Sequence, residues 1–208
     1  GAGVQGSRLS ATQRRRIGLV RALVKRPNVL VVDQNNGHGA SVREVQQVST
    51  GATGTIAGVA NVVTITQSKG LVERVNQTYT GDGTAGTENR VTITQSSGQF
   101  QQNDVGDSGG FQFSDRGVFQ TGDSNTATIT QSGGNNNQVR TLEQTGSGNT
   151  FTSLQNGGNG NRMLRLYQTG DSNTASLTQT GTENRIDNMQ QNGDSNSVTV
   201  SQLGSDNR

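Results

Sequence analysis

The stretch Gln120-Thr-Gly-Asp-Ser-Asn125-Thr-Ala-Thr-Ile-Thr-Gln131 is one copy of a sequence repeat that recurs along the chain. Its pattern is Gln-x-Gly-x-x-Asn-x-Φ-x-Φ-x-Gln, where Φ is usually an apolar residue. Whole segments return: GDSNTA stands at 122–127 and 170–175, and GTENR at 86–90 and 181–185. From residue 120 onward, the asparagines of successive copies lie 11 or 12 residues apart. A fixed internal period is typical of a repeat architecture, in which each copy is one structural unit.

Each copy reads as a β-strand followed by a turn, because its apolar residues alternate with polar ones. Threonines fall on one face of this strand, and the other face carries Asn125, Ala127, Ile129 and Gln131. The connection Gln-Thr-Gly-Asp-Ser-Asn holds glycine, aspartate and asparagine, which tolerate positive φ angles. Two such strands packed face to face would make a coil of about 22–24 residues. The sequence therefore predicts an all-β fold, a β-solenoid of stacked strand-turn-strand coils.

Two copies are one residue longer than the others. Asn137 to Gln144 and Asn161 to Gln168 each span eight residues, whereas 125–131 spans seven. In the longer copies two apolar residues stand three apart, so a strict alternation would turn one of them outward. A β-bulge, which adds one residue to one strand, would return both to the same face. We therefore expect a bulge in each of these two strands.

The inward face of every copy carries amides where an ordinary core would carry Leu or Val. Coils stacked about 4.8 Å apart place each Asn or Gln above its counterpart, so the amides can hydrogen-bond as ladders. A ladder satisfies both the donor and the acceptor of an amide, which is otherwise costly to bury. The predicted ladder and assembly residues are Asn125, Gln131, Asn137, Gln144, Asn149, Gln155, Asn161, Gln168, Asn173, Gln179, Asn184, Gln190, Asn196 and Gln202.

The composition alone is typical of a disordered chain, since 27% of the residues are apolar and 3% are aromatic. The register of the amides argues against that interpretation, because a disordered segment needs no fixed period. A single histidine and no cysteine leave no support for a metal site or a nucleophilic triad. No run of about 18 apolar residues exists, so no membrane span is predicted. We therefore expect no enzyme activity and no cofactor.

Two copies also match a known family pattern. Residues 120–131 and 168–179 resemble the curlin repeat, Gln-x-Gly-x-x-Asn-x-Ala-x-x-x-Gln. The resemblance is clear over 120–208 and loose over 55–119. It implies a secreted, extracellular subunit of curli, the bacterial functional amyloid of the biofilm matrix and of adhesion, whose β-solenoids stack end to end. It also implies three partners, namely identical subunits, a nucleating homologue and an outer-membrane export pore.

Two segments, 78–88 and 96–119, break the register of the repeats. We interpret each as a loop inserted at a coil corner or as a degraded coil. The last residues, from Gln202 to Arg208, open another repeat and show no obvious polar cap. A solenoid edge with open hydrogen-bonding groups favours assembly with further coils.

The first fifty residues differ in chemistry from the rest. Residues 1–50 hold eight Lys or Arg against two acidic residues, whereas 51–208 hold nine basic and thirteen acidic residues. The overall charge of +2 therefore averages two unlike segments and gives no argument for nucleic-acid binding. Apolar periodicity predicts a helix over about 10–25 and a short strand over 28–33. We divide the chain at residue 50 into a helix–strand domain and a repeat domain.

This first segment resembles part of an ABC-type ATPase, namely the signature motif, its helix and the Walker B strand. The resemblance implies that Ser10 and Gln13 are signature residues that contact a nucleotide, and that Asp33 organises Mg²⁺. Gln34 stands where that family has its catalytic glutamate, and an amide cannot act as a base. No Gly-x-x-x-x-Gly-Lys-Ser/Thr phosphate loop occurs in the chain. We therefore interpret the segment as vestigial, without ATP hydrolysis.

These observations favour a structural subunit of an extracellular, amyloid-like fibre that assembles through its amide ladders. One alternative is a capped, monomeric β-solenoid that binds ice or a surface ligand through Thr-x-Thr rows, such as Thr64/Thr66, Thr92/Thr94 and Thr126/Thr128/Thr130. Against this alternative stand breaks in the rows at Arg162, Arg165, Arg185 and Asp187. A remote alternative is an ABC-type ATPase fragment.

Overall fold

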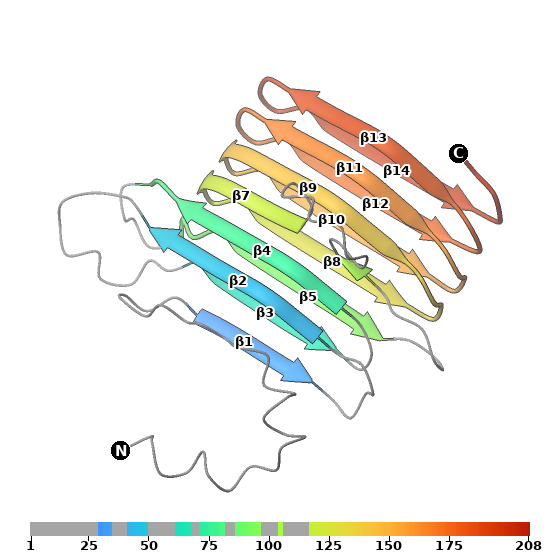
Figure 1. Cartoon of the computed structure of the whole chain (residues 1–208). Coiled ribbons are helices and arrows are strands. Elements are labelled where there is room, and N and C mark those ends of the chain that lie inside the picture. The colour runs from blue at the N-terminus through green and yellow to red at the C-terminus, as the bar shows by residue number, and fades with distance from the viewer. Residues whose placement is uncertain are drawn as a thin grey trace, which may run out of the picture.

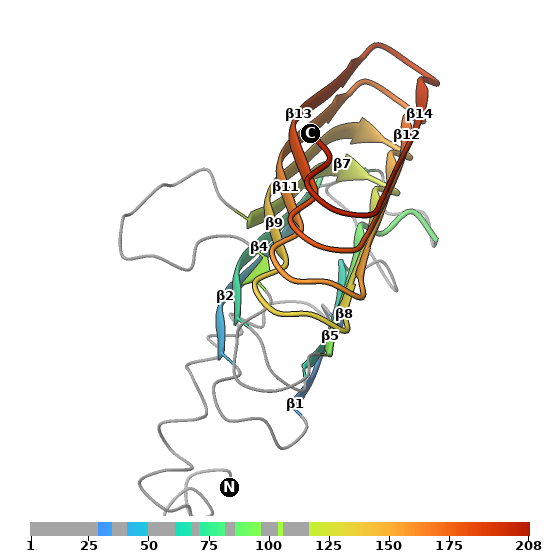
Figure 2. The ribbon, with the colours of Figure 1, turned by 90° about the vertical axis from the view of Figure 1, so that its right-hand side faces the viewer.

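The computed structural model describes residues 29–34, 41–49, 61–67, 71–81, 86–96, 104–105 and 117–208. These residues form fourteen β-strands and no helix. The strands make two walls (Figure 1), and the view turned by 90° shows the walls facing each other, joined by stacked corners (Figure 2). The chain crosses from one wall to the other and back, so it winds as a β-solenoid. The predicted all-β solenoid is confirmed, and the helix expected over about 10–25 lies outside the described residues.

Each wall is a parallel sheet whose strands come from successive coils. The first sheet contains, in spatial order, β1 (Val29–Gln34), β3 (Val62–Gln67), β5 (Arg90–Ser96), β8 (Thr126–Ser132), β10 (Thr150–Asn156), β12 (Thr174–Thr180) and β14 (Ser197–Leu203). The second sheet contains β2 (Ser41–Ser49), β4 (Leu71–Tyr79), β6 (Asp104–Val105), β7 (Gly117–Asp123), β9 (Gln138–Ser147), β11 (Arg162–Thr169) and β13 (Arg185–Asn192). Parallel pairing in register places equivalent residues of the repeat in columns.

The strands before residue 50 join the same two sheets. β1 pairs with β3, so that Leu30, Val32 and Gln34 stand opposite Val63, Ile65 and Gln67. β2 likewise pairs with β4. The strand expected over 28–33 is therefore present over 29–34, where it extends the stack. The division of the chain into two domains at residue 50 stays a prediction, although the sheets run across that position.

The core is a narrow apolar layer between the two sheets. The first-sheet strands β3, β5, β8 and β12 each contribute two inward apolar side chains, as β8 does with Ala127 and Ile129, and β10 contributes Phe151. The second sheet contributes pairs such as Val139 and Leu142 from β9. A fully buried aliphatic side chain stabilises the fold by about 1.5–3 kcal/mol. One coil buries few such groups, so stability comes from the stacking of many coils.

The coil corners depend on residues with positive φ. In the turn between β7 and β8, Gly122 has φ 119° and Ser124 has φ 58°, and this pair recurs in the turn between β11 and β12 as Gly170 and Ser172. Positive φ therefore falls on glycine and serine, not on the aspartate and asparagine of the same turn. A Cβ atom on Gly122 would overlap the carbonyl oxygen of Gly146 in the next coil. The close approach of stacked corners thus requires glycine at this position.

The expected β-bulge, one extra residue in one strand, is not what the structure shows. Neighbouring strands of the second sheet each carry the extra residue, and these unpaired residues form a column, which we call the bulge of this wall. Pairing of β9 with β11 passes from Val139↔Met163 to Thr141↔Arg165 and skips one residue in each strand. Val139 and Leu142 are both fully buried, as are Met163 and Leu166, so the extra residue does not turn either apolar side chain outward. The same skip occurs between β2 and β4 and between β11 and β13. The bulge is therefore a shared property of this wall and not of two isolated strands.

The irregular segment 96–119 contains one interrupted strand of the second sheet. Val105 of β6 stands opposite Val139, and Gly117 of β7 stands opposite Thr141. In β9, one residue separates Val139 from Thr141. Between their partners Val105 and Gly117 lie residues 106–116, which are outside the described residues. The interruption falls at the bulge in the middle of a strand. Neither of the two expected explanations, a corner loop or a degraded coil, describes this arrangement.

Candidate functional site: the amide ladders

The glutamines of the first sheet form one continuous ladder. The side chain of each glutamine donates from Nε2 to Oε1 of the next glutamine toward the C-terminus, at 2.8–2.9 Å. The members are Gln67, Gln95, Gln131, Gln155, Gln179 and Gln202. All of them except Gln202 are buried. A ladder inside the core replaces the hydration that each amide loses on burial.

The second sheet has its own glutamine ladder, with the same direction of donation. Its Nε2–Oε1 distances are 2.8–3.0 Å, and its members are Gln47, Gln77, Gln120, Gln144, Gln168 and Gln191. The predicted member Gln190 is wrong, since its side chain is exposed and bonds to Asn192. Because β13 carries the bulge of its wall, Gln191 pairs with Gln168 while Gln190 pairs with Tyr167.

Two asparagine ladders run in the opposite direction. Each asparagine donates from Nδ2 and from its backbone N–H to Oδ1 of the asparagine in the preceding coil. The first ladder contains Asn89, Asn125, Asn149, Asn173 and Asn196, with Nδ2–Oδ1 distances of 2.9–3.1 Å. The second contains Asn137, Asn161, Asn184 and Asn207, at 2.6–3.2 Å. The dipoles of the asparagine and glutamine ladders therefore oppose one another across the core.

In most ladder amides, the remaining donor binds a backbone carbonyl at a coil boundary. Gln131 Nε2 donates to the carbonyl of Asn137 at 3.0 Å, and Asn149 Nδ2 donates to the carbonyl of Gly170 at 2.8 Å. The ladders thus fix the corners as well as the walls. Asn61 does not join a ladder: its Nδ2 donates to the carbonyls of Val48 and Gln77, and its buried Oδ1 has no hydrogen-bond partner among the described residues. The Asn89 side chain donates to backbone carbonyls of Thr78 and Gly122 instead of to Asn61.

All the predicted ladder residues except Gln190 lie in these four ladders. The sequence analysis did not predict the ladder members before Asn125. For those of the second sheet, the sequence explains the omission. The strands of Gln47 and Gln77 follow the bulged pattern Φ-x-x-Φ-x-Gln, as in Val72-x-x-Val75-x-Gln77, without an asparagine at the start. The same pattern occurs in the longer copies, so it could have located these glutamines.

The proposed nucleotide-binding residues do not form a described site. Ser10 and Gln13 lie outside the described residues, and Asp33 stands opposite Thr66 in the first sheet. The segment that resembles a Walker B strand is Asn28-x-Leu30-x-Val32-x-Gln34, which also fits the repeat pattern Asn-x-Φ-x-Φ-x-Gln. Among the described residues, no group of three or more His, Cys, Asp or Glu side chains could hold a metal ion.

One edge of the described stack ends with unused ladder groups. In the coil of β13 and β14, Oδ1 of Asn196 and Oδ1 of Asn207 accept no hydrogen bond from the described residues. Gln202 Nε2 donates only to the carbonyl of Arg185, at 3.0 Å. Leu203 beside it is 70% exposed. This edge presents the same donors and acceptors that join each coil to the next.

Comparison with protein families finds a match over one part of the chain. Residues 163–187 match the family model of the curlin associated repeat. The matched curlin repeat runs from β11 through β12 to the start of β13 and so spans one full turn of the solenoid. The comparisons do not support the resemblance to an ABC-type ATPase. No curated protein and no solved structure matches the chain. No helix of the described part is long and apolar enough to cross a membrane.

The register of Gln190 and Gln191 can be tested directly. Replacing Gln191 by Ala removes the bonds to Gln168 and to the carbonyl of Thr174. We expect a loss of unfolding free energy of about 1–3 kcal/mol. Replacing Gln190 by Ala alters only an exposed side chain, and we expect a change within about 0.5 kcal/mol. Urea unfolding followed by circular dichroism measures both, and equal losses would contradict the assigned register.

Proposed function

We propose that this chain is the structural subunit of an extracellular, curli-type fibre, in which copies stack end to end through their Asn and Gln ladders. The observation that carries this proposal is the repetition of the ladders. Each coil offers its neighbour the same amide donors and acceptors, so a coil of a second copy can continue the column as a coil of the same chain does. The curlin repeat over 163–187 supports the same role.

The family resemblance supplies the remaining partners of this proposal. A secreted fibre subunit needs an export pore in the outer membrane and a nucleating homologue that starts the stack. The resulting fibre would contribute to the biofilm matrix and to adhesion. The proposed role requires no catalytic residue and no cofactor.

A single substitution at the edge of the stack tests the proposal. Gln202→Glu keeps an oxygen that accepts from Gln179, whose Nε2 lies 2.8 Å from Oε1 of Gln202. It removes the amide donor, with its bond to the carbonyl of Arg185, and places a carboxylate where a second copy would stack. Circular dichroism therefore has to show first that the variant keeps its fold. Burying an unpaired carboxylate is strongly unfavourable. We expect the substituted chain to fold but to form fibres far more slowly at neutral pH, as thioflavin fluorescence and electron microscopy measure.

The pH dependence of this variant follows from the same carboxyl group. A glutamate side chain has an ordinary pKa of about 4.3, and burial against a second copy raises that pKa. Fibre formation should therefore recover as the pH falls through the raised pKa, because the protonated carboxyl is neutral and carries an O–H donor. Gln190→Glu is the matched control, since Gln190 is exposed on the same coil. Normal fibre formation by Gln202→Glu at neutral pH would contradict stacking through this edge.

A further inference from the structure

The outer face of the first sheet carries an ordered array of hydroxyl groups. Outward positions of β3, β5, β8, β10, β12 and β14 align in columns, of which three are rich in Thr and Ser, and a fourth at the strand ends holds Ser96, Ser132, Asn156, Thr180 and Leu203. The central column is Thr64, Thr92, Thr128, Thr152, Ser176 and Thr199. The flanking columns hold Thr126, Thr150, Thr174 and Ser197 on one side, and Thr66, Thr94, Thr130, Thr178 and Ser201 on the other. In the three Thr-rich and Ser-rich columns, every position except Val62, Arg90 and Leu154 is Thr or Ser.

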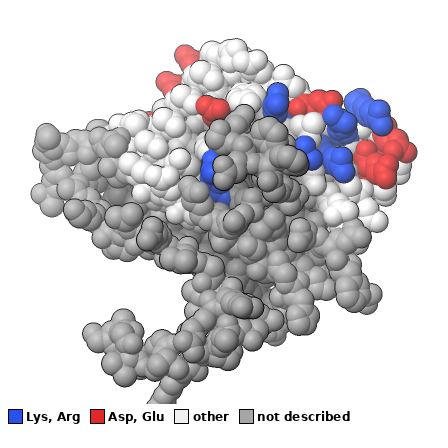
Figure 3. Space-filling model, viewed as in Figure 1, with Lys and Arg blue, Asp and Glu red and all other residues white. Residues whose placement is uncertain are grey.

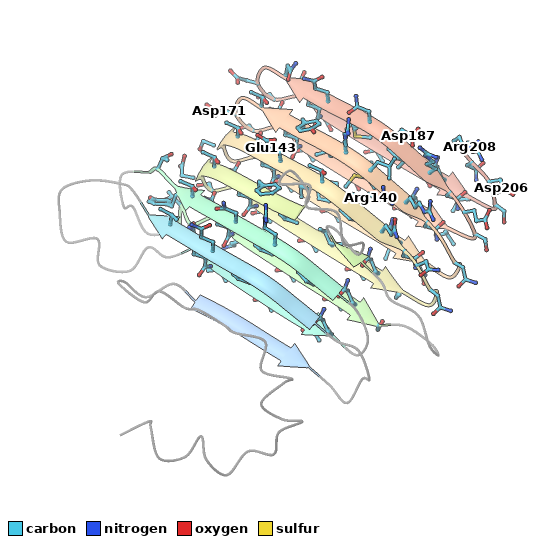
Figure 4. All side chains as sticks on the ribbon, in the orientation of Figure 1. Arg140, Glu143, Asp171, Asp187, Asp206 and Arg208 are labelled. Carbon is cyan, nitrogen blue, oxygen red and sulfur yellow. The ribbon has the colours of Figure 1, made fainter. Side chains whose placement is uncertain are left out.

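The other wall of the solenoid has a different outer face. Its outward residues include Arg140, Glu143, Arg162, Arg165, Arg185 and Asp187. Figure 3 shows cationic and anionic side chains intermixed on this side, and Figure 4 places Arg140, Glu143 and Asp187 on it. The charged residues that were expected to break the Thr-x-Thr rows therefore lie on the opposite sheet. The second sheet has one outward threonine column, Thr78, Thr121, Thr145 and Thr169, whereas the first sheet has three adjacent columns of Thr and Ser. Strand preference alone would distribute threonine equally over the two walls.

The array is regular in two directions and rigid. Adjacent strands lie about 4.8 Å apart, and alternate residues along a strand lie about 6.6–6.8 Å apart. Threonine is β-branched, so its χ1 angle is restricted and its hydroxyl and methyl groups keep a fixed direction. The amide ladders behind the sheet hold successive coils in register. The result is a repeating surface of hydroxyl and methyl groups from β3 to β14, with Arg90 as the one charged residue in its three columns; in β1, Asp33 stands opposite Thr66.

We propose that this face binds ice, with a layer of ordered water as the ligand. Water in a crystal repeats in two dimensions, and a hydroxyl array of fixed spacing can bond to many of its molecules at once. The methyl groups meet the same water layer without offering competing donors. A polysaccharide is less well matched, because the array contains no aromatic side chain on which a sugar ring could stack. The proposal uses the outer face of one sheet and does not depend on fibre assembly.

Thermal hysteresis of the full 208-residue chain tests the proposal. We expect the unmutated protein to lower the freezing point of a solution below its melting point and to change the shape of growing ice crystals. Thr152→Lys places a long cation in the centre of the array, where Thr152 is exposed, and should remove most of this hysteresis. Thr169→Lys is the matched control, because Thr169 is an exposed threonine on β11 of the other sheet.

Circular dichroism establishes that both variants keep the β-fold, and only folded variants are compared. Hysteresis retained by Thr169→Lys and lost by Thr152→Lys supports the ice-binding face. Absence of hysteresis from the unmutated chain, or equal losses in the two variants, overturns the proposal. If Thr152→Lys changes only the sideways association of fibres seen by electron microscopy, the face is a contact between copies and the proposal is likewise overturned. Fibre growth measured by thioflavin reports separately on the proposed function.

Discussion

Replacing Asn173 and Gln179 together by Ala is expected to interrupt both the solenoid and its assembly. Asn173 bonds to Asn149 on one side and to Asn196 on the other, and Gln179 links Gln155 to Gln202. Each deletion leaves buried amide groups without partners, at a cost of about 1–3 kcal/mol per group. We expect the pair to lower the unfolding free energy by about 2–6 kcal/mol, a large fraction of the stability of an ordinary domain.

The same pair of substitutions should greatly lengthen the lag before fibres appear in a thioflavin assay. In a nearly one-dimensional stack, each coil contacts only the coils next to it. One weakened coil therefore affects fibre growth as well as folding. The matched control changes Thr126 and Thr128 to Ser on the outer face of β8, where we expect at most about 0.5 kcal/mol per site. Similar lags for the two double variants would show that the ladders do not govern assembly.

Replacing Gly146 by Ala is expected to force two coils apart. Gly146 has φ 119°, outside the range that alanine adopts easily, and a Cβ atom there would overlap the carbonyl oxygen of Gly170. That carbonyl accepts a hydrogen bond from Asn149 Nδ2 at 2.8 Å. Backbone strain and overpacking each cost about 1–3 kcal/mol, so we expect a loss of about 2–6 kcal/mol. Thermal or urea unfolding of the unassembled chain measures this loss.

Gly157 supplies the control for the corner. It also has positive φ, at 81°, but a Cβ atom there would have no neighbour within 4 Å. Gly157→Ala therefore introduces backbone strain without a steric clash, and we expect a loss of about 1–2 kcal/mol. The difference between the two variants isolates the close approach of stacked corners. If Gly157→Ala proved as destabilising as Gly146→Ala, the spacing between coils would not be the limiting factor.

Much of the fold could be predicted from the sequence, because the pattern within one repeat unit predicts a strand and its recurrence predicts stacking. Alternation within Asn125–Gln131 predicts a strand with an amide at each end of its inward face. The recurrence of that unit every 11 or 12 residues predicts stacking, since one copy buries too few apolar groups to be stable alone. Stacking in register then predicts amide ladders, because an unpaired buried amide is costly.

Other features depend on which coil lies next to which, and only the tertiary structure decided them. Gln190 and Gln191 are adjacent and chemically identical, so the pattern within one copy cannot tell them apart. The bulge that β9 and β11 share imposes its register on β13, and this selects Gln191. The strand over 29–34 has a sequence compatible with two families, and its pairing with β3 places it in the solenoid.

The distribution of hydroxyl and charged side chains over the two outer faces was likewise decided by the tertiary structure. Within the sequence, threonine rows and charged residues alternate from copy to copy and look like one interrupted surface. In the solenoid, alternate copies belong to opposite walls, so most outward hydroxyl groups lie on the first sheet and most outward charges of the repeats lie on the second. Local patterns therefore determined what each strand buries, because burial depends on the alternation within a strand. Winding determined what each wall displays, because neighbours on a wall are one full coil apart in the chain.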